Sequence, residues 1–272
     1  MRHQSARCSV EFPLARITSH SVRNLQQLPL SIHADRYAGR AGAFAASMIG
    51  HDLQRREALV LGDGPRIPPL QVDELTGDLL KIVAQMIQVN TALASREREA
   101  LTELMSDQSP EASAADISNL PEIVRTMLRH PDLFSRHTEV GIQLLCKGTL
   151  SKRDRELAVL RIGWLCQAPY EWGEHVIVAK SVGIEKHEIE RITQGSDAPG
   201  WSEHEQAILR AAEELYRDAM ISDATWETLS KRLDDRQLIE LPILIGQYQA
   251  VAYYQNSLRL RLHSGNLGLK AR

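Results

Sequence analysis

The sequence predicts an all-α protein whose helices pack as antiparallel hairpins. From Val72 onward apolar residues recur at helical spacing, and proline and glycine are confined to segment boundaries. No run of residues alternates between apolar and polar as a half-buried strand does. The 43% hydrophobic content of the 272 residues is enough for a sizeable core.

The first 70 residues or so differ from the rest and are predicted to be an irregular N-terminal extension. Their apolar residues follow neither helical nor strand spacing, and GDGPRIPPL has the glycine and proline content of a linker. Only 41–53 has the composition of a short helix. We therefore expect the folded domain to span 71–272.

Within 71–272 a first helix is expected over 73–105, followed by a polar break over 106–118. The other predicted helices span 120–129, 134–146, 153–166, 170–182, 185–193, 203–220, 223–233 and 236–262. Ser202 and Glu205 have capping-box spacing, and Gly183 and Gly195 are typical helix stops. The last helix is apolar on more than one side, so we expect it to pack in the core and against another subunit.

Composition excludes several classes of function. The net charge is −3 and the sequence mixes acidic with basic residues, so no basic face for nucleic acid is expected. The N-terminus lacks the apolar core of a secretory signal, and no later run is long enough to span a membrane; we expect a cytoplasmic protein with no membrane partner. Cys8, Cys146 and Cys166 form no C-x-x-C pair, so neither a disulfide framework nor a zinc site is supported.

The stretch APYEWGEH, residues 168–175, carries the densest chemistry of the chain. Pro169 suits the first turn of a helix, where its missing N–H is not needed. Glu171 and His175 are four positions apart, so they share one helix face. If the preceding helix folds back through Gln167 and Ala168, Glu156 also reaches His175, and two carboxylates would tune one imidazole for acid–base chemistry near neutral pH.

Simpler interpretations of the same residues stay open. Glu171 with His175 is also a helix-stabilising pair worth about 0.2–0.5 kcal/mol. Tyr170 and Trp172 suit core packing as well as a pocket wall, and Arg161 suits a solvated salt bridge as well as an anchor for an anionic substrate. A metal site needs three or four ligands, and the nearest further candidates, His187 and Glu190, lie beyond Gly183. We expect neither a metal nor a cofactor.

The string RDRELAVLRIGWLCQAPYEWGEHVIVAKSVGI, followed by APGWSEHEQAILRAAEELYRDAMISDATWETLSKRLDDRQLIELPILIGQYQAVAYYQNSL, resembles the carboxymuconolactone decarboxylase family, which includes the alkyl hydroperoxidase D proteins. The resemblance runs from about 65 to 262 and is strongest over 153–183; LPEIVRTMLRHP at 120–131 also resembles the family. It implies an all-α fold of helix hairpins in a homo-oligomer, a trimer or a multiple of it, although a dimer stays possible. The extension and a helical insertion at about 92–118 exceed what a minimal member needs.

The resemblance implies two chemistries. Decarboxylase members act on small lactone acids by proton transfer with a histidine, whereas peroxidase members use a Glu, a C-x-x-C pair and a His. Placing that motif here assigns the Glu to Glu156 and the His to His175, while the cysteine positions fall on Ala168 and Glu171. Without those thiols a disulfide-cycling peroxidase is not expected.

We therefore expect a decarboxylase-like enzyme that performs acid–base chemistry on a small anionic carbonyl or lactone compound. His175 would transfer the proton, Glu156 and Glu171 would orient and tune it, and the substrate-binding residues would be Tyr170, Trp172 and Arg161. Two alternatives stay open: an antioxidant peroxidase that uses Cys146 or Cys166, and a non-catalytic helical assembly protein. The sequence does not identify the substrate. It also does not decide whether the reaction is decarboxylation, isomerisation or hydrolysis.

Overall fold

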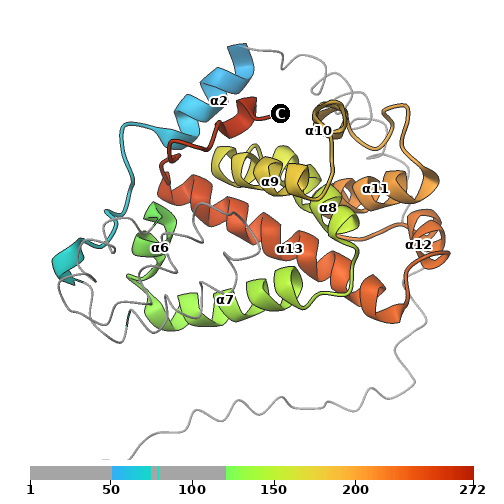
Figure 1. Ribbon diagram of the computed structural model, residues 1–272, viewed down its shortest axis with the longest axis horizontal. Coiled ribbons are helices and arrows are strands. Elements are labelled where there is room, and N and C mark those ends of the chain that lie inside the picture. Colours follow the sequence, from blue (N-terminus) through green and yellow to red (C-terminus); the bar gives the residue numbers. More distant parts are fainter. Residues whose placement is uncertain (1–50, 75–78, 80–120) are drawn as a thin grey trace, which may run out of the picture. The chain divides into compact units, whose positions relative to one another are not determined.

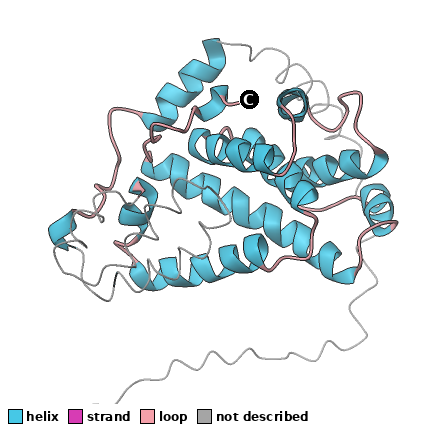
Figure 2. Cartoon of the chain, in the orientation of Figure 1, coloured by secondary structure: helices cyan, strands magenta, loops and turns pink. Residues whose placement is uncertain are grey.

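The computed structural model describes residues 51–74, 79 and 121–272, and all regular elements among them are helical (Figure 2). The α-helices are α2 (His51–Leu61), α6 (Glu122–Met127), α7 (Pro131–Cys146), α8 (Lys152–Leu165), α9 (Pro169–Ser181), α10 (Lys186–Gln194), α11 (Glu203–Asp218), α12 (Asp223–Ser230) and α13 (Asp235–Leu258). Two 3₁₀ turns, η1 (Val72–Glu74) and η2 (Gly268–Lys270), complete the described elements. The all-α prediction is confirmed for this part of the chain.

Helix α8 lies at the centre of the core. It packs against α9, α10, α11 and α13 (Figure 1), and every side chain from Arg155 to Gly163 is buried. Leu157, Leu160 and Ile162 are completely excluded from solvent. A helix that is buried on all sides can keep charged residues only if each is paired, and this requirement shapes the site described below.

The helix boundaries follow the predicted signals. Ser151 caps α8 by accepting a hydrogen bond from the backbone N–H of Asp154, and Ser202 with Glu205 forms a complete capping box at the start of α11. Gly183 and Gly195, which follow α9 and α10, have φ angles of +87° and +105° in the region that favours glycine. The capped start of α11 and the two glycine stops are therefore confirmed, whereas α7 begins at 131 rather than 134 and α12 ends at 230 rather than 233.

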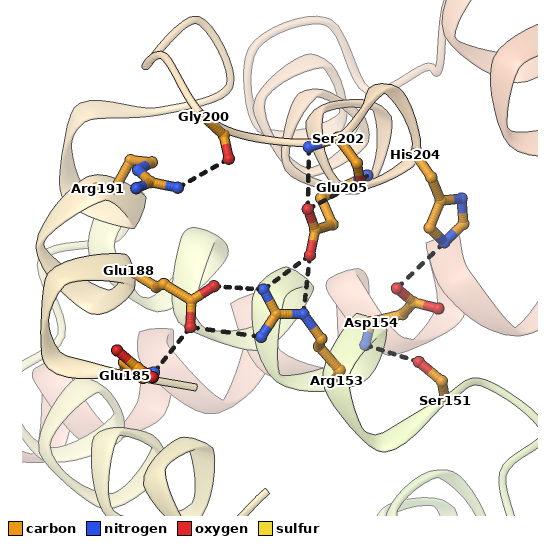
Figure 3. Close-up of polar contacts among 10 residues, drawn as sticks. All are labelled: Ser151, Arg153, Asp154, Glu185, Glu188, Arg191, Gly200, Ser202, His204 and Glu205. Atoms are coloured by element: carbon orange, nitrogen blue, oxygen red, sulfur yellow. Dashed lines mark hydrogen bonds and ion pairs between the residues drawn. The ribbon is translucent and has the colours of Figure 1, made fainter. Parts of the chain in front are cut away.

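The starts of α8, α10 and α11 are tied together by ion pairs (Figure 3). Arg153 of α8 lies between Glu188 of α10 and Glu205 of α11, with its Nε 2.8 Å from Glu205 Oε1. Beside it, Nε2 of His204 lies 3.1 Å from Oδ1 of Asp154. Arg153 thus connects the starts of three helices.

The structure describes only the last part of the predicted N-terminal extension. Residues 51–61 form α2 within the segment expected to be irregular, because tertiary contacts stabilise a helix that has no clear apolar period. Val60 is buried, and Glu57 Oε2 accepts a hydrogen bond from the backbone N–H of Leu269. The predicted helix at 73–105 and the insertion at 92–118 lie almost entirely outside the described residues.

Helix α13 ends at Leu258 rather than at 262, because Arg259 turns the backbone into the left-handed region with φ +59°. The segment 259–272, here called the C-terminal arm, then returns to α9. Its Asn266 donates a hydrogen bond to the carbonyl oxygen of Tyr170, and its Ala271 carbonyl accepts one from the indole N–H of Trp172.

None of the described helices is long and apolar enough to cross a lipid bilayer.

Candidate active site

Helices α8 and α9 place the functional side chains, and a three-residue connection at 166–168 joins them. Gln167 takes a left-handed φ of +49°, and the backbone N–H of Ala168 bonds to the carbonyl of Gly163, which turns the chain sharply. Pro169 begins α9, as predicted. This hairpin packs α9 against α8, so residues from both helices meet in the core.

Three of the expected residues meet there and are called the Glu–His–Glu array: Glu156 of α8, and His175 and Glu171 of α9. Nδ1 of His175 lies 2.7 Å from Oε2 of Glu156, and Nε2 of His175 lies 3.2 Å from Oε1 of Glu171. The exposed fractions are 0% for Glu156, 4% for Glu171 and 3% for His175. Both ring nitrogens therefore face a carboxylate in a water-poor environment.

Two more side chains satisfy the remaining carboxylate oxygens. Arg155 donates from Nε to Oε1 of Glu156 at 2.8 Å and from a terminal nitrogen to the carbonyl of Leu145. Gln255 of α13 donates from Nε2 to Oε2 of Glu171 at 2.7 Å. Arg155 and a protonated His175 supply two cations for the two carboxylates. This charge balance lowers the free-energy cost of burying the array.

The contacts within the array shift the pKa values of His175 and Glu156. Burial alone would lower the pKa of His175, but attraction and hydrogen bonds from Glu156 and Glu171 outweigh it and raise the pKa to about 10. Burial opposes ionisation of Glu156, yet His175 and Arg155 hold its pKa below the ordinary value. At neutral pH His175 is therefore an imidazolium whose two N–H groups both point at carboxylates.

The array borders a cavity of about 150 Å³ between α6, α7, α9 and α13. Its apolar lining consists of Pro121, Ile123, Val124, Phe134, Leu145 and Val251. Its polar lining includes Glu171, Glu174, His175 and Gln255, together with His137, Thr138 and Gln247. A small apolar molecule with a few polar atoms is the kind of ligand that such a cavity suits.

The three expected substrate-binding residues differ in whether they line the cavity. Tyr170 lines the cavity. Trp172 is fully buried away from it, packed against Trp164 with ring centroids 4.8 Å apart. Arg161 also lies away from the cavity; its Nε donates to Glu213 at 2.8 Å and a terminal nitrogen donates to the carbonyl of Ile192.

Several cavity residues were not anticipated, because they lie on α7 and α13, far along the chain from the motif. On α13, Tyr248 stacks edge-on against His175 with ring centroids 4.8 Å apart, and Tyr254 meets His137 of α7 at 5.4 Å. Burial lowers the pKa of His137, although Glu171 partly offsets this effect, so His137 is neutral at pH 7. The only sequence signal for these residues was the apolar period of their helices, which does not reveal what they face.

The two described cysteines lie outside the cavity lining. Burial, reinforced by the nearby carboxylate of Glu171, raises the pKa of Cys166 to about 12. Cys146 is exposed, and partial burial of its thiol raises its pKa. Among the residues that the structure describes, no group of three or more His, Cys, Asp or Glu side chains has an arrangement that could hold a metal ion.

Residues 131–214, from α7 through most of α11, match the model of the carboxymuconolactone decarboxylase family. Over this segment the chain is similar to that family. The match includes all three members of the Glu–His–Glu array. Of the two positions at which peroxidase relatives are expected to carry thiols, Ala168 is fully buried and Glu171 borders the cavity.

Solved structures share this fold at low sequence identity. An alkylhydroperoxidase AhpD core protein from Ralstonia eutropha, an uncharacterized peroxidase-related protein, is 16% identical with a TM-score of 0.54 over 75% of this chain and 97% of that chain. The debrominase Bmp8 in complex with 2,3,4-tribromopyrrole is 13% identical with a TM-score of 0.55 over 75% and 95%. These similarities establish the fold; no match was found among curated protein sequences.

Proposed function

We propose that this chain is an acid–base enzyme that moves a proton at a small carbonyl or lactone compound. The observation that supports the proposal is the buried Glu–His–Glu array, which ends at a cavity of about 150 Å³. Enzymes build proton-transfer sites in this way, with ionisable groups whose environments separate their pKa values beside a space for substrate.

The geometry favours Glu171 as the group that exchanges a proton with the substrate. His175 already carries its proton at neutral pH, and both of its nitrogens are engaged by carboxylates. Glu171 is the carboxylate of the array that borders the cavity. In the sequence interpretation His175 transferred the proton; in this proposal His175 and Glu156 are positioning residues that fix and polarise Glu171.

The proton transfer involves one C–H bond of the substrate and the carboxylate of Glu171. A C–H bond next to a carbonyl breaks, its electron pair stays on the substrate as an enolate, and the proton goes to the Glu171 carboxylate. The imidazolium of His175 stabilises the negative charge that remains near the site. Decarboxylation of an acid next to such a carbonyl can use the same groups: Glu171 takes the proton of the substrate's carboxyl group, the C–C bond to that group breaks to release CO₂ and leave an enolate, and Glu171 returns the proton to the enolate carbon.

The test is exchange of substrate C–H for deuterium, followed by NMR in D₂O with a panel of small ketones and lactones. The full-length chain is expected to catalyse exchange of at least one compound, and Glu171→Gln is expected to abolish it. Glu203→Gln is the matched control, since Glu203 pairs with Lys231 on the surface. Exchange that survives Glu171→Gln unchanged would exclude this mechanism.

A thiol-based peroxidase is the weaker candidate. Neither described cysteine lines the cavity, and the pKa of each thiol is raised, which disfavours the reactive thiolate. A purely structural role for the array is also weaker, because the array borders an open cavity rather than a filled core.

A further inference from the structure

The amide of Gln255 carries an acceptor that has no partner among the described residues. Gln255 is 3% exposed and lines the cavity, and its Oε1 is a buried oxygen without a hydrogen bond. Its other terminal atom, Nε2, donates to Oε2 of Glu171 at 2.7 Å. A buried carbonyl oxygen without a partner is destabilising, so this site suits a hydrogen-bond donor.

The carboxylate of Glu171 fixes the orientation of this amide. Turning the amide over would place two oxygens 2.7 Å apart, which is repulsive because a carboxylate oxygen has no proton to donate. Oε1 is therefore the atom of Gln255 left for a ligand, and it accepts only from an O–H or N–H group. That donor would lie directly beside the Glu171 carboxylate.

The charges around the cavity disfavour an anionic ligand. Glu171 and Glu174 both belong to its wall, and the imidazolium of His175 already has a carboxylate at each nitrogen. Among the described residues, no lysine or arginine lines the cavity. Moving a carboxylate into this wall would add a third negative charge with no free cation to receive it.

Size and lining favour a single ring. A cavity of about 150 Å³ lined by apolar side chains is the size that holds one benzene ring in an engineered protein. Here Phe134 and Val251 supply apolar wall, and the rings of Tyr248 and Tyr254 supply aromatic surfaces.

We propose that this cavity binds an uncharged, single-ring compound that donates an O–H or N–H hydrogen bond to Oε1 of Gln255, beside Glu171. Gln255 is thus assigned as a specificity-determining residue. The inference rests on the proposed acid–base function of the same site and names its substrate class, in place of the anionic substrate expected from the sequence.

Two pairs of ring compounds with matched shapes test the proposal at pH 7 with the full-length chain. Phenol and toluene differ in the hydroxyl donor, and benzamide and benzoate differ in charge and donor. We expect calorimetric or NMR titration to show phenol binding at least tenfold more tightly than toluene, and benzamide at least tenfold more tightly than benzoate. Equal affinities within the first pair, or tighter binding of benzoate, would overturn the proposal.

A variant assigns the selectivity to Gln255. Gln255→Met keeps the length of the side chain and removes the acceptor, so the preference for phenol over toluene should disappear while toluene still binds. Gln143→Met is the matched control, because Gln143 lies on α7 outside the cavity lining and should retain the preference. If phenol keeps its advantage in a folded Gln255→Met variant, Gln255 is not the acceptor.

Binding and catalysis are judged separately. The titrations need no turnover, and the wild-type pairs are decisive even if Gln255→Met does not fold. Loss of deuterium exchange in Glu171→Gln combined with tight benzoate binding would support the acid–base function and reject the substrate class. Unchanged deuterium exchange in Glu171→Gln, combined with at least tenfold weaker binding of benzoate than of benzamide, would reject the function and keep the ligand class.

Discussion

The carboxylate of Glu156 lies 2.7 Å from Nδ1 of His175, and both side chains are buried. One comes from α8 and the other from α9, so the pair fastens the hairpin at the centre of the core. Arg155 supplies the second cation, at 2.8 Å from Glu156. Each charge in this arrangement depends on its partners, because water does not reach it.

Glu156→Gln should therefore destabilise the protein strongly. Removing the carboxylate leaves the imidazolium and the Arg155 guanidinium short of one negative charge in the core, which costs about 3–5 kcal/mol. Denaturant unfolding measures the loss. Glu203→Gln, which removes one partner of the exposed pair with Lys231, should cost less than about 1 kcal/mol; similar losses in the two variants would contradict the role given to Glu156.

The stability of the protein should fall on the alkaline side. The pKa of His175 is raised to about 10 from its ordinary 6.5, so the folded state holds a proton that the unfolded state releases between these values. The stabilisation is fully present below about pH 6.5 and is lost as the pH rises through 10. At about 1.4 kcal/mol per pKa unit, the total is a few kcal/mol.

Denaturant unfolding at pH 6, 8 and 10 measures this dependence. The His175→Gln variant has no such proton to lose, so its unfolding free energy should fall less steeply over the same range. Parallel curves for the two proteins would show that His175 does not carry the raised pKa.

The thiol of Cys166 should react slowly with electrophiles in the folded protein. Burial, with a contribution from Glu171, raises the pKa of Cys166 to about 12, so almost none of it is thiolate at pH 8. Labelling with a disulfide reagent, mapped by mass spectrometry, should modify Cys166 only after denaturation. The Cys146→Ser/Cys166→Ser double variant should keep its proton-transfer activity; loss of that activity would revive the thiol mechanism.

Gly173→Ala should detach the C-terminal arm from α9. A Cβ at this position would overlap the side chain of Asn266, which donates to the Tyr170 carbonyl at 2.9 Å and accepts from the backbone of Gly268 at 2.8 Å. We expect a loss of about 1–3 kcal/mol. Gly246 of α13 has open space around it, so Gly246→Ala should instead stabilise by up to about 1 kcal/mol. Calorimetry compares the two; the same sign for both would contradict this account.

The array could be predicted because its geometry is local. Glu171 and His175 are one helical turn apart, and a short connection brings Glu156 opposite them, so period and loop length are sufficient to place all three. The same reasoning placed the starts of α8, α9 and α11. The predicted self-association of the chain and its cytoplasmic location stay predictions.

The remainder of the site depends on how the helices pack, which the helical spacing of apolar residues does not determine. Trp172 follows Glu171 directly, yet the helix turns it toward the C-terminal arm and Ala271. Gln255 lies 84 positions from Glu171, and only the register of α13 against α9 brings their side chains together. Arg161 faces α10 and α11 because Glu213 and the end of α10 offer it partners there.

The acid–base groups lie close together along the chain as well as in space. Glu156 and His175 are separated by 19 positions, and Glu171 lies between them. A single hairpin therefore contains the Glu–His–Glu array and Arg155, and the neutral amide of Gln255 comes from α13. An exchange of this one segment between relatives, within a common fold, would transfer or remove the chemistry in one step, and the lining from α7 and α13 would be left to change independently.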